Sequence, residues 1–300
     1  MHKGKVIFES AQAKVIDCKT CGFAHVNPLP SQVELNEFYE KRFYQNVKTS
    51  YFTDYERDQD WWAINYEWMI DDILQAYKGK KKKDALRLLD IGSGPGLFLE
   101  VAKKNGIEAK GIEPSKEAYE YSTKKYGCDV TNVTLEELDK SIGKFDVVHS
   151  SLVLEHILNP LNFIKKSKSL LNANGLLCVV VPNDFNPIQE VMKQLGTPEW
   201  WISPFEHLNY FNRKSIKALF EKAGLEVVHQ SVTFPIDLFL TFGQDYLKNP
   251  EVGKACHAMR KTFEFNIQKT KQVKLKNDLY KAFSKLDIGR ELIIIGRKKA

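Results

Sequence analysis

A glycine-rich turn between an apolar strand and a helix is the feature that most constrains how this chain can fold. The stretch LRLLDIGSGPGLFLE, residues 86–100, contains the end of such a strand, a turn with Gly92, Gly94 and Gly96, and the start of a helix. A dinucleotide-binding turn has the spacing G-x-G-x-x-G, and Leu97 stands where the third glycine of that pattern would fall. The turn therefore predicts a bound ligand at the end of a strand, and a ligand other than NAD.

Short apolar segments alternate with helical patterns on the C-terminal side of this turn. We expect strands at 86–90, 109–113, 145–150 and 176–181, and helices at 97–104, 116–125 and 161–171. A further helix at 213–223, a strand at 226–231 and a last strand in ELIIIGRKK continue the pattern. The alternation predicts an α/β fold with a doubly wound, Rossmann-like, mostly parallel sheet that helices cover on both faces.

The remaining segments surround this core. We expect an N-terminal extension with a Cys-x-x-Cys hairpin at 1–50, and an aromatic helix with a lysine-rich linker at 51–83. The core spans 84–231 with a lid at 185–212, a helical insertion follows at 232–289, and the last core strand lies at 290–300. Within the extension, Ser31 and Glu34 predict a capped helix over 31–44, and a second helix is expected over 54–77. The lysine run at 78–84 is interpreted as a solvated linker, with a phosphate-binding patch as the alternative.

Composition restricts the class of protein. The chain has 300 residues, a formal net charge of +6 and an odd number of cysteines, 5, which argues for a reducing cytoplasm rather than a disulfide framework. The longest apolar runs are far shorter than the roughly 20 residues that cross a bilayer, and the N-terminus lacks the apolar stretch of a signal peptide. The charge permits an anionic substrate but does not require nucleic acid.

An acidic residue follows the second expected strand. Glu113 stands at the tip of AKGIEPS, where a carboxylate can accept hydrogen bonds from both hydroxyls of a ribose. Pro95 suits a first helical turn, whose free N–H groups favour an anion such as a carboxylate. The turn and the acidic strand tip together predict a ligand with a ribose and an anionic group.

These motifs resemble the class I S-adenosylmethionine-dependent methyltransferases. Asp90, Gly92, Gly94 and Gly96 match the D/E-x-G-x-G-x-G pattern of that family, and GIEPS resembles its second motif. The segments FDVVHSSLVLEHILNP and LLNANGLLCVVVPN are similar to its fourth and fifth strands. The resemblance implies S-adenosylmethionine as the cofactor, with its methionine part at the turn, its ribose at Glu113 and its adenine beside Asn132–Thr134. The implied cofactor-binding residues are Asp90, Gly92, Ser93, Gly94, Gly96, Glu113, Pro114, Asn132, Val133 and Ser151.

Two histidines are candidates for a general base or for substrate contact. Glu155 and His156 directly follow the strand expected at 145–150. His207 lies in the lid with Trp200, Trp201 and Tyr210, and we expect these lid residues to line the substrate pocket. The alternatives are that His156 caps the next helix and that His207 packs within a loop. Some family members bind a metal through an acidic-x-x-Glu-His stretch, but Leu152 stands at the first acidic position here.

The N-terminal CKTCGFAHVNPLP and the lid resemble the type 23 methyltransferase-domain subgroup, some members of which carry a small zinc-binding extension. Cys18 and Cys21 have the spacing of half a zinc site, but no second Cys-x-x-Cys follows and His25 is the only nearby candidate ligand. We therefore expect a hairpin held by packing, and no metal site.

The resemblance implies an enzyme that transfers a methyl group from S-adenosylmethionine to an oxygen or nitrogen of a small molecule. Aromatic walls suit a sugar or related metabolite, and Lys248, Lys254 and Lys261 in the insertion suit a phosphorylated or nucleotide-linked one. An RNA methyltransferase and a cofactor-binding protein without catalysis are the alternatives. The Asn/Asp-Pro-Pro-aromatic motif of base methylation is absent after the 145–150 strand, so nucleic acid is not expected as a partner. A homodimer remains open.

Overall fold

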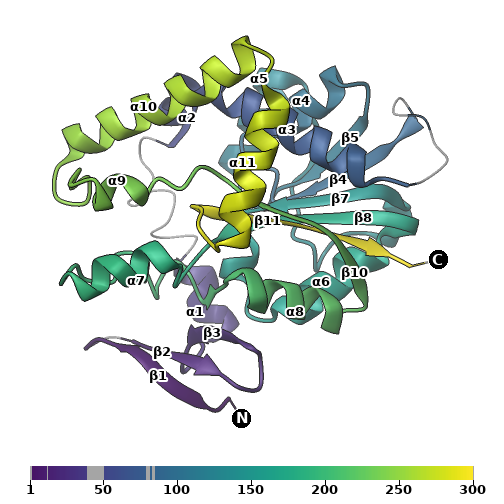
Figure 1. Cartoon of the computed structure of the whole chain (residues 1–300). Coiled ribbons are helices and arrows are strands. Elements are labelled where there is room, and N and C mark those ends of the chain that lie inside the picture. The colour runs from purple at the N-terminus through teal and green to yellow at the C-terminus, as the bar shows by residue number, and fades with distance from the viewer. Residues whose placement is uncertain (1, 12, 39–50, 79–81, 83–84, 300) are drawn as a thin grey trace.

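The computed structural model describes residues 2–11, 13–38, 51–78, 82 and 85–299 (Figure 1). Its central sheet has the strand order β10-β11-β8-β7-β4-β5-β6. The strands β4 (Arg87–Ile91), β5 (Glu108–Ile112), β6 (Asp129–Thr131), β7 (Phe145–Ser151) and β8 (Leu171–Pro182) are parallel. The strand β11 (Glu291–Lys298) runs antiparallel between β8 and β10 (Leu225–Val232). The predicted mostly parallel α/β sheet is thus confirmed.

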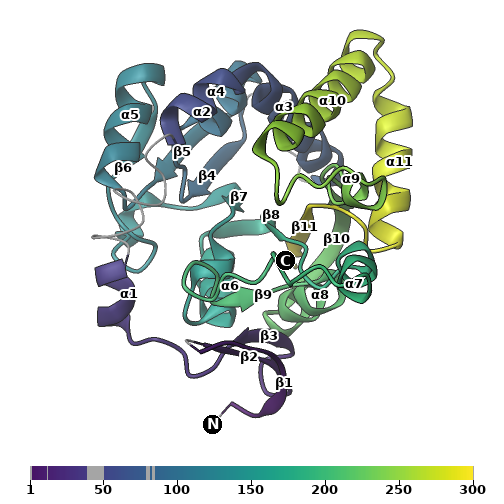
Figure 2. The same ribbon diagram turned by 90° about the vertical axis from the view of Figure 1, so that its left-hand side faces the viewer.

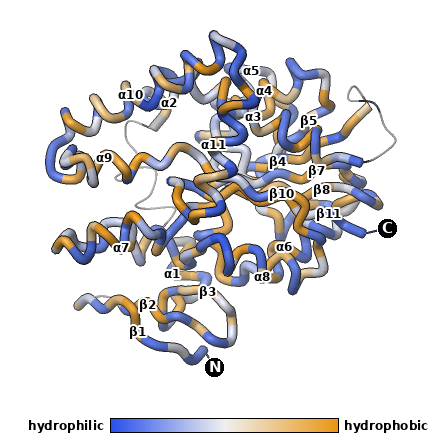
Figure 3. Tube along the Cα trace, viewed as in Figure 1, coloured by the Kyte–Doolittle hydropathy of each residue, from blue (hydrophilic) through white to orange (hydrophobic). Residues whose placement is uncertain are grey.

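Neighbouring residues of the central strands serve two hydrophobic cores, one on each face of the sheet. Leu89 packs in the core that includes Phe163 of α6 (Pro160–Ser169) and Phe220 of α8 (Arg213–Lys222). Leu88 packs in the other core, with residues of α3 (Gln59–Ala76) and α4 (Leu97–Lys104). The nearly continuous apolar sequence of these strands follows from burial on both faces, and apolar residues concentrate along them in Figure 3. The helix α5 (Lys116–Tyr126) follows β5.

Several element boundaries differ from those predicted. The expected helix over 54–77 is divided into α2 (Tyr51–Arg57) and α3, with Asp58 at the break. The strand β8 begins at Leu171 rather than at 176, because Leu171 already pairs with Phe145 of β7, before an irregularity in the register that ends at Leu176. The short β6 was not predicted. The helix α1 (Gln32–Phe38) has the expected Ser31–Glu34 capping hydrogen bonds, whereas the rest of the predicted 31–44 helix and most of the lysine run lie outside the described residues.

A second, small sheet joins the N-terminal extension to the lid. It has the order β1-β2-β3-β9, with β1 (Gly4–Glu9), β2 (Lys14–Cys18) and β3 (Phe23–Val26) from the extension and β9 (Asn209–Tyr210) from the lid (Figure 2). The Phe23 ring lies 5.0 Å from the Phe211 ring, which belongs to the main core. The lid also contains α7 (Pro187–Gln194). The extension is therefore integrated into the structure at the lid.

The insertion before the last strand folds back on the aromatic helix. It consists of α9 (Leu238–Thr241), α10 (Pro250–Lys269) and α11 (Val273–Lys285). On α3, the Trp61 indole N–H donates to Glu264 of α10, and the Trp68 indole N–H donates to Gln268 at 2.9 Å. Of the helices that the structure describes, none combines the length and the apolar character needed to cross a membrane.

Candidate functional site

The strand order of the central sheet reverses between β4 and β7, and the glycine turn lies at this point. Gly92 and Ser93 donate their backbone N–H groups to Ile112 O of β5, at 2.8 and 3.1 Å. Gly92 has φ +73°, and a Cβ atom there would lie 2.5 Å from the Val153 side chain. Only glycine therefore lets the end of β4 approach the segment after β7 so closely. Ligands of open α/β sheets bind at such a crevice.

Glu113 is held in place at the tip of β5 by the backbone around it. One carboxylate oxygen accepts a 2.8 Å hydrogen bond from Gly94 N–H, and the other accepts one of 2.8 Å from Ser115 N–H. Burial raises the pKa of Glu113, while these two hydrogen bonds act in the opposite direction. The Asn132 amide donates to the carbonyls of Glu113 and Pro114, at 2.7 and 2.9 Å. The structure thus brings the predicted residues of the turn, the β5 tip and the β6 loop together.

Asp90 has a partner that the sequence analysis did not identify. His149 of β7 lies opposite Asp90 in the parallel register and donates its Nδ1–H to the Asp90 carboxylate at 2.7 Å. Both side chains are buried. The Phe98 ring stacks on the His149 ring with centroids 3.9 Å apart. A histidine in the middle of the expected strand was the available signal, but the sequence does not show which acidic residue it faces.

The residues at this crevice fit S-adenosylmethionine. Its ribose has two adjacent hydroxyls, for which a buried carboxylate such as Glu113 is a suitable acceptor. Its methionine part carries a carboxylate, which suits the N–H groups at the start of α4. The Ser93 hydroxyl is buried and has no hydrogen-bond partner among the described residues, so a polar ligand group could satisfy it. Ser151 is the last residue of β7, at the same edge of the sheet.

The two candidate histidines lie next to each other. His156 ends the short helix η4 (Leu154–His156), and Val153, the residue before η4, is the one that contacts Gly92. The rings of His156 and His207 lie 5.2 Å apart. His156 donates its Nδ1–H to Glu206 O at 2.5 Å, and its Nε2 lies 3.7 Å from the carboxylate of the buried Glu155. The predicted catalytic residues thus form one cluster, connected to the glycine turn through Val153.

The backbone of the lid is hydrogen-bonded to the segment that carries His156. Leu208 N–H donates to Glu155 O at 2.8 Å, and the Asn209 amide donates to Ile157 O at 2.7 Å. Sequence reasoning missed Asn209, which carries no chemical signature of its own. Among the predicted lid residues, Trp201 and Tyr210 are buried, and Trp200 is partly exposed with its ring 4.9 Å from that of Trp201. Trp200 is therefore the tryptophan with surface left for a ligand.

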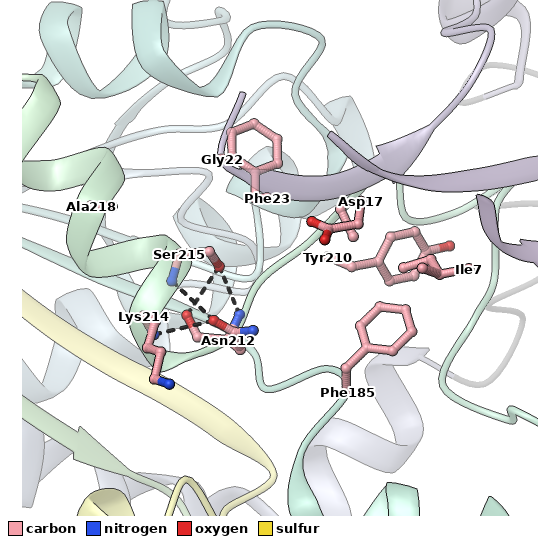
Figure 4. Close-up of a pocket in the computed structure, with 11 residues that line it drawn as sticks. Ile7, Asp17, Gly22, Phe23, Phe185, Tyr210, Asn212, Lys214, Ser215 and Ala218 are labelled. Carbon is pink, nitrogen blue, oxygen red and sulfur yellow. Dashed lines mark hydrogen bonds between the residues drawn. The ribbon is translucent and has the colours of Figure 1, made fainter. Parts of the chain in front are cut away.

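A pocket of about 460 Å³ lies between the N-terminal sheet and α8. Figure 4 shows Tyr210 and Phe185 on one side of it and Lys214 and Ser215 of α8 on another. Neither the glycine turn nor the histidine cluster lines this pocket. This pocket is therefore distinct from the crevice between β4 and β7, although residues of the lid line it.

The lysines expected near an anionic acceptor pair with carboxylates of the chain. The ammonium of Lys248 lies 3.0 Å from Asp245, that of Lys254 lies 2.7 Å from Glu251, and that of Lys261 lies 2.5 Å from Asp58. The first two pairs are formed within the insertion, and the third connects α10 to the start of α3. The Lys261–Asp58 pair therefore helps to hold the insertion on α3, whereas the other two are exposed pairs between residues three apart, which contribute little to stability.

The fold and the crevice together define a class of protein. A parallel sheet whose order reverses at a glycine turn, an acidic residue at the tip of the neighbouring strand and an antiparallel last strand are the arrangement of the class I S-adenosylmethionine-dependent methyltransferases. The family described as "Methyltransferase domain" (type 23) matches residues 61–230, more than half of the chain, and the chain belongs to this family. The predicted resemblance is confirmed, and S-adenosylmethionine is the cofactor.

Curated relatives agree with this assignment. The ubiquinone biosynthesis O-methyltransferase of Cereibacter sphaeroides is 31% identical over 155 residues, which are 48% of this chain and 62% of that protein. The chain thus spans less than two thirds of that relative. The enzyme of the same name from Pelagibacter ubique is 28% identical over 207 residues, 62% of this chain and 86% of that protein.

Two solved structures share the fold. A SAM-dependent methyltransferase from Archaeoglobus fulgidus has a TM-score of 0.50 at 19% identity and covers 83% of this chain and 99% of its own. The plantazolicin methyltransferase BpumL, solved with SAH, has a TM-score of 0.54 at 14% identity and covers 89% of this chain and 96% of its own. At these identities the likeness concerns the fold alone.

Proposed function

We propose that this chain catalyses O-methylation, the transfer of the methyl group of S-adenosylmethionine to a hydroxyl oxygen of a small, ring-shaped molecule. The observation that supports the proposal is the Glu155–His156–His207 cluster, which follows Val153, the residue against which Gly92 of the glycine turn packs. The curated relatives named O-methyltransferases support oxygen, rather than nitrogen, as the methylated atom.

The cofactor supplies a methyl group that its sulfonium already activates. The chain therefore has to align the acceptor, exclude water and remove the hydroxyl proton. In this proposal His156 Nε2 is the base that accepts the proton of the acceptor hydroxyl. The hydrogen bond from His156 Nδ1 to Glu206 O selects the tautomer in which Nε2 can accept a proton, and the nearby Glu155 carboxylate stabilises the imidazolium that forms. His207, which lies against the His156 ring, contacts the acceptor in this proposal.

The lid provides an aromatic wall for a ring-shaped acceptor, with Trp200 as its partly exposed member. A sugar and a phenol both carry hydroxyl groups on a ring. A phosphorylated or nucleotide-linked acceptor has less support, because the insertion lysines pair with carboxylates of the chain.

A panel of acceptors tests the proposal through the release of S-adenosylhomocysteine. We expect turnover with a hydroxyl-bearing sugar or phenol, and none with the corresponding O-methylated compound, with amines or with RNA. His156→Gln is expected to lower kcat about 10²–10⁴-fold, the usual contribution of a general base, with unchanged affinity for the cofactor. Lys217→Gln, at an exposed position of α8 and outside the cluster, is the control. If only RNA or only amines are methylated, the proposed hydroxyl acceptor is wrong. If His156→Gln keeps the full kcat, His156 is not the base.

A further inference from the structure

Four side chains of the N-terminal extension converge on one point: His2, Cys18, Cys21 and His25. One potential ligand atom from each lies within 4.8 Å of all the others. His2 Nδ1 is 3.3 Å from Cys21 Sγ and 3.7 Å from Cys18 Sγ, and the two histidine rings are 4.6 Å apart. The sequence analysis considered His25 but not His2, because residue 2 is far from the Cys-x-x-Cys in the sequence.

The backbone explains why these residues meet. Cys18 ends β2, and Gly22, with φ +84°, donates its N–H to Cys18 O at 2.8 Å, so that the chain turns tightly through Cys21. His25 follows on β3, which pairs with β2. Gly4 lies opposite Cys18 in the pairing of β1 with β2, which brings His2 to the same end of the hairpin. A Cβ atom at Gly4 would lie 2.0 Å from Asp17 O, so the close approach of β1 requires glycine there.

His25 gives a second, independent indication of a ligand. Its side chain is only 1% exposed, and its Nδ1–H donates to Val26 O at 2.7 Å. That hydrogen bond leaves the Nε2 lone pair as an acceptor, yet Nε2 is buried and has no hydrogen-bond partner among the described residues. A metal ion would satisfy this nitrogen, and a metal-bound histidine typically donates its other ring N–H to a carbonyl in this way.

We propose that His2 Nδ1, Cys18 Sγ, Cys21 Sγ and His25 Nε2 together bind one Zn²⁺ ion. Two thiolates and two imidazoles form a tetrahedral set that suits zinc. Zn–S bonds of about 2.3 Å and Zn–N bonds of about 2.0–2.1 Å place tetrahedral ligand atoms roughly 3.3–3.8 Å apart, and the two distances from His2 Nδ1 to the sulfurs fall in this range. All four positions are filled by the chain, as in a structural rather than a catalytic zinc site.

The site lies at the base of the sheet that carries the lid. His25 pairs with Asn209 and Ala24 pairs with Tyr210 between β3 and β9. The Asn209 side chain in turn holds Ile157 O, next to the segment with His156. The zinc ion therefore stabilises β3, the strand with which β9 pairs. The binding of zinc does not depend on which acceptor the crevice binds.

Metal analysis of the full chain tests the proposal. The protein is produced with a C-terminal tag that contains no histidine, so that His2 keeps its position, and is reconstituted with ZnCl₂ under reducing conditions before gel filtration. We expect about one zinc ion per chain by mass spectrometry. The double variant Cys18→Ser/Cys21→Ser is expected to retain none, and His2→Gln and His25→Gln to bind zinc more weakly. Cys256→Ser changes a buried cysteine of α10 and is the matched control, with zinc content unchanged.

A cobalt titration keeps the proposal falsifiable where a variant does not fold. Co²⁺ added to the metal-free wild-type chain is expected to give the visible d–d bands of a tetrahedral site and a thiolate-to-cobalt charge-transfer band, both lost on addition of zinc. A wild-type chain that holds no more zinc than the double variant overturns the proposal. So does a cobalt spectrum without thiolate ligation, or a Cys18–Cys21 disulfide in the protein as it is isolated under reducing conditions.

Discussion

His149 on β7 donates its Nδ1–H to the Asp90 carboxylate on β4 at 2.7 Å, and both side chains are buried. The two strands are those between which the strand order reverses, so this hydrogen bond joins the two halves of the sheet beside the glycine turn. Asp90 was predicted to bind the cofactor. The structure gives its carboxylate a partner within the chain, which favours a role in positioning the glycine turn that begins two residues later.

We expect Asp90 and His149 to be energetically coupled. A hydrogen bond to a charged group contributes about 1.5–3 kcal/mol, so Asp90→Asn and His149→Gln should each lower the free energy of unfolding by an amount of this order. The double variant should lose less than the sum of the two, because the second change removes no further contact. Urea unfolding of all four proteins measures the coupling, with Asp129→Asn at the exposed end of β6 as the control. Strictly additive losses would show that the pair is not coupled.

Glu113→Gln is expected to weaken the binding of S-adenosylmethionine. The charged hydrogen bond to a ribose hydroxyl is worth about 1.5–3 kcal/mol, which corresponds to a loss of affinity of roughly tenfold or more. Because burial raises the pKa of Glu113, the affinity of the wild-type chain should also fall on acidification at a higher pH than for an ordinary glutamate. Calorimetric titration measures both effects. Glu120→Gln, on the exposed side of α5, is the control, and an equal affinity in the two variants would contradict the assignment of Glu113.

The sequence predicted the core sheet well, because its signals are local. Strands buried on both faces are nearly continuous apolar runs, and the strand that precedes the Gly92–Gly96 turn was placed to within one residue. Elements stabilised by partners distant in the sequence were missed. The strand β9 has two residues and exists because it pairs with β3, and α2 and α3 separate at Asp58, whose carboxylate pairs with His257 and Lys261 of α10.

The residues of the candidate site show the same difference between local signals and partners that are distant in the sequence. The positions of the glycines and of Glu113 at the ends of neighbouring strands were predictable, because the glycine turn and the acidic residue each directly follow a short apolar segment. The partners of these residues were not, since a sequence does not show that His149 faces Asp90 or that Asn209 holds the segment of His156. The proposed metal ligand His2 is the extreme case, because the pairing of β1 with β2 brings it to Cys18.

Asp184 is expected to make the stability of the protein depend on pH. It follows β8, and burial raises its pKa to about 8 from the ordinary value of 3.8; Arg290 opposes this shift and Asp237 adds to it. Between these two pH values the carboxyl stays protonated in the folded chain and is ionised in the unfolded one. The unfolded state therefore gains stability as the pH rises, by up to about 1.4 kcal/mol per pH unit from this group.

Asp184→Asn should remove this loss. The variant is expected to gain free energy of unfolding relative to the wild type as the pH rises from 4 towards 8, because an amide resembles the protonated carboxyl and does not ionise. Urea unfolding at several pH values gives the difference between the two proteins. Asp278→Asn, at an exposed position of α11, should not show the same rise. A difference between Asp184→Asn and the wild type that is independent of pH would contradict the raised pKa.

Glu264 of α10 is expected to hold the insertion on the aromatic helix α3. Its carboxylate is fully buried and accepts hydrogen bonds from the Trp61 indole N–H and, at 2.6 Å, from the Tyr280 hydroxyl. Glu264→Ala leaves both donors buried without this acceptor, at a cost of about 1–3 kcal/mol for each. Glu251→Ala removes a glutamate from the exposed start of the same helix, and the free energy of unfolding should change little.

Because α3 also places Tyr66 against Phe98, which stacks on His149, the Glu264 variant should bind S-adenosylmethionine more weakly as well. Urea unfolding and calorimetric titration measure the two effects, and equal stability of the two variants would show that the insertion is not anchored through Glu264.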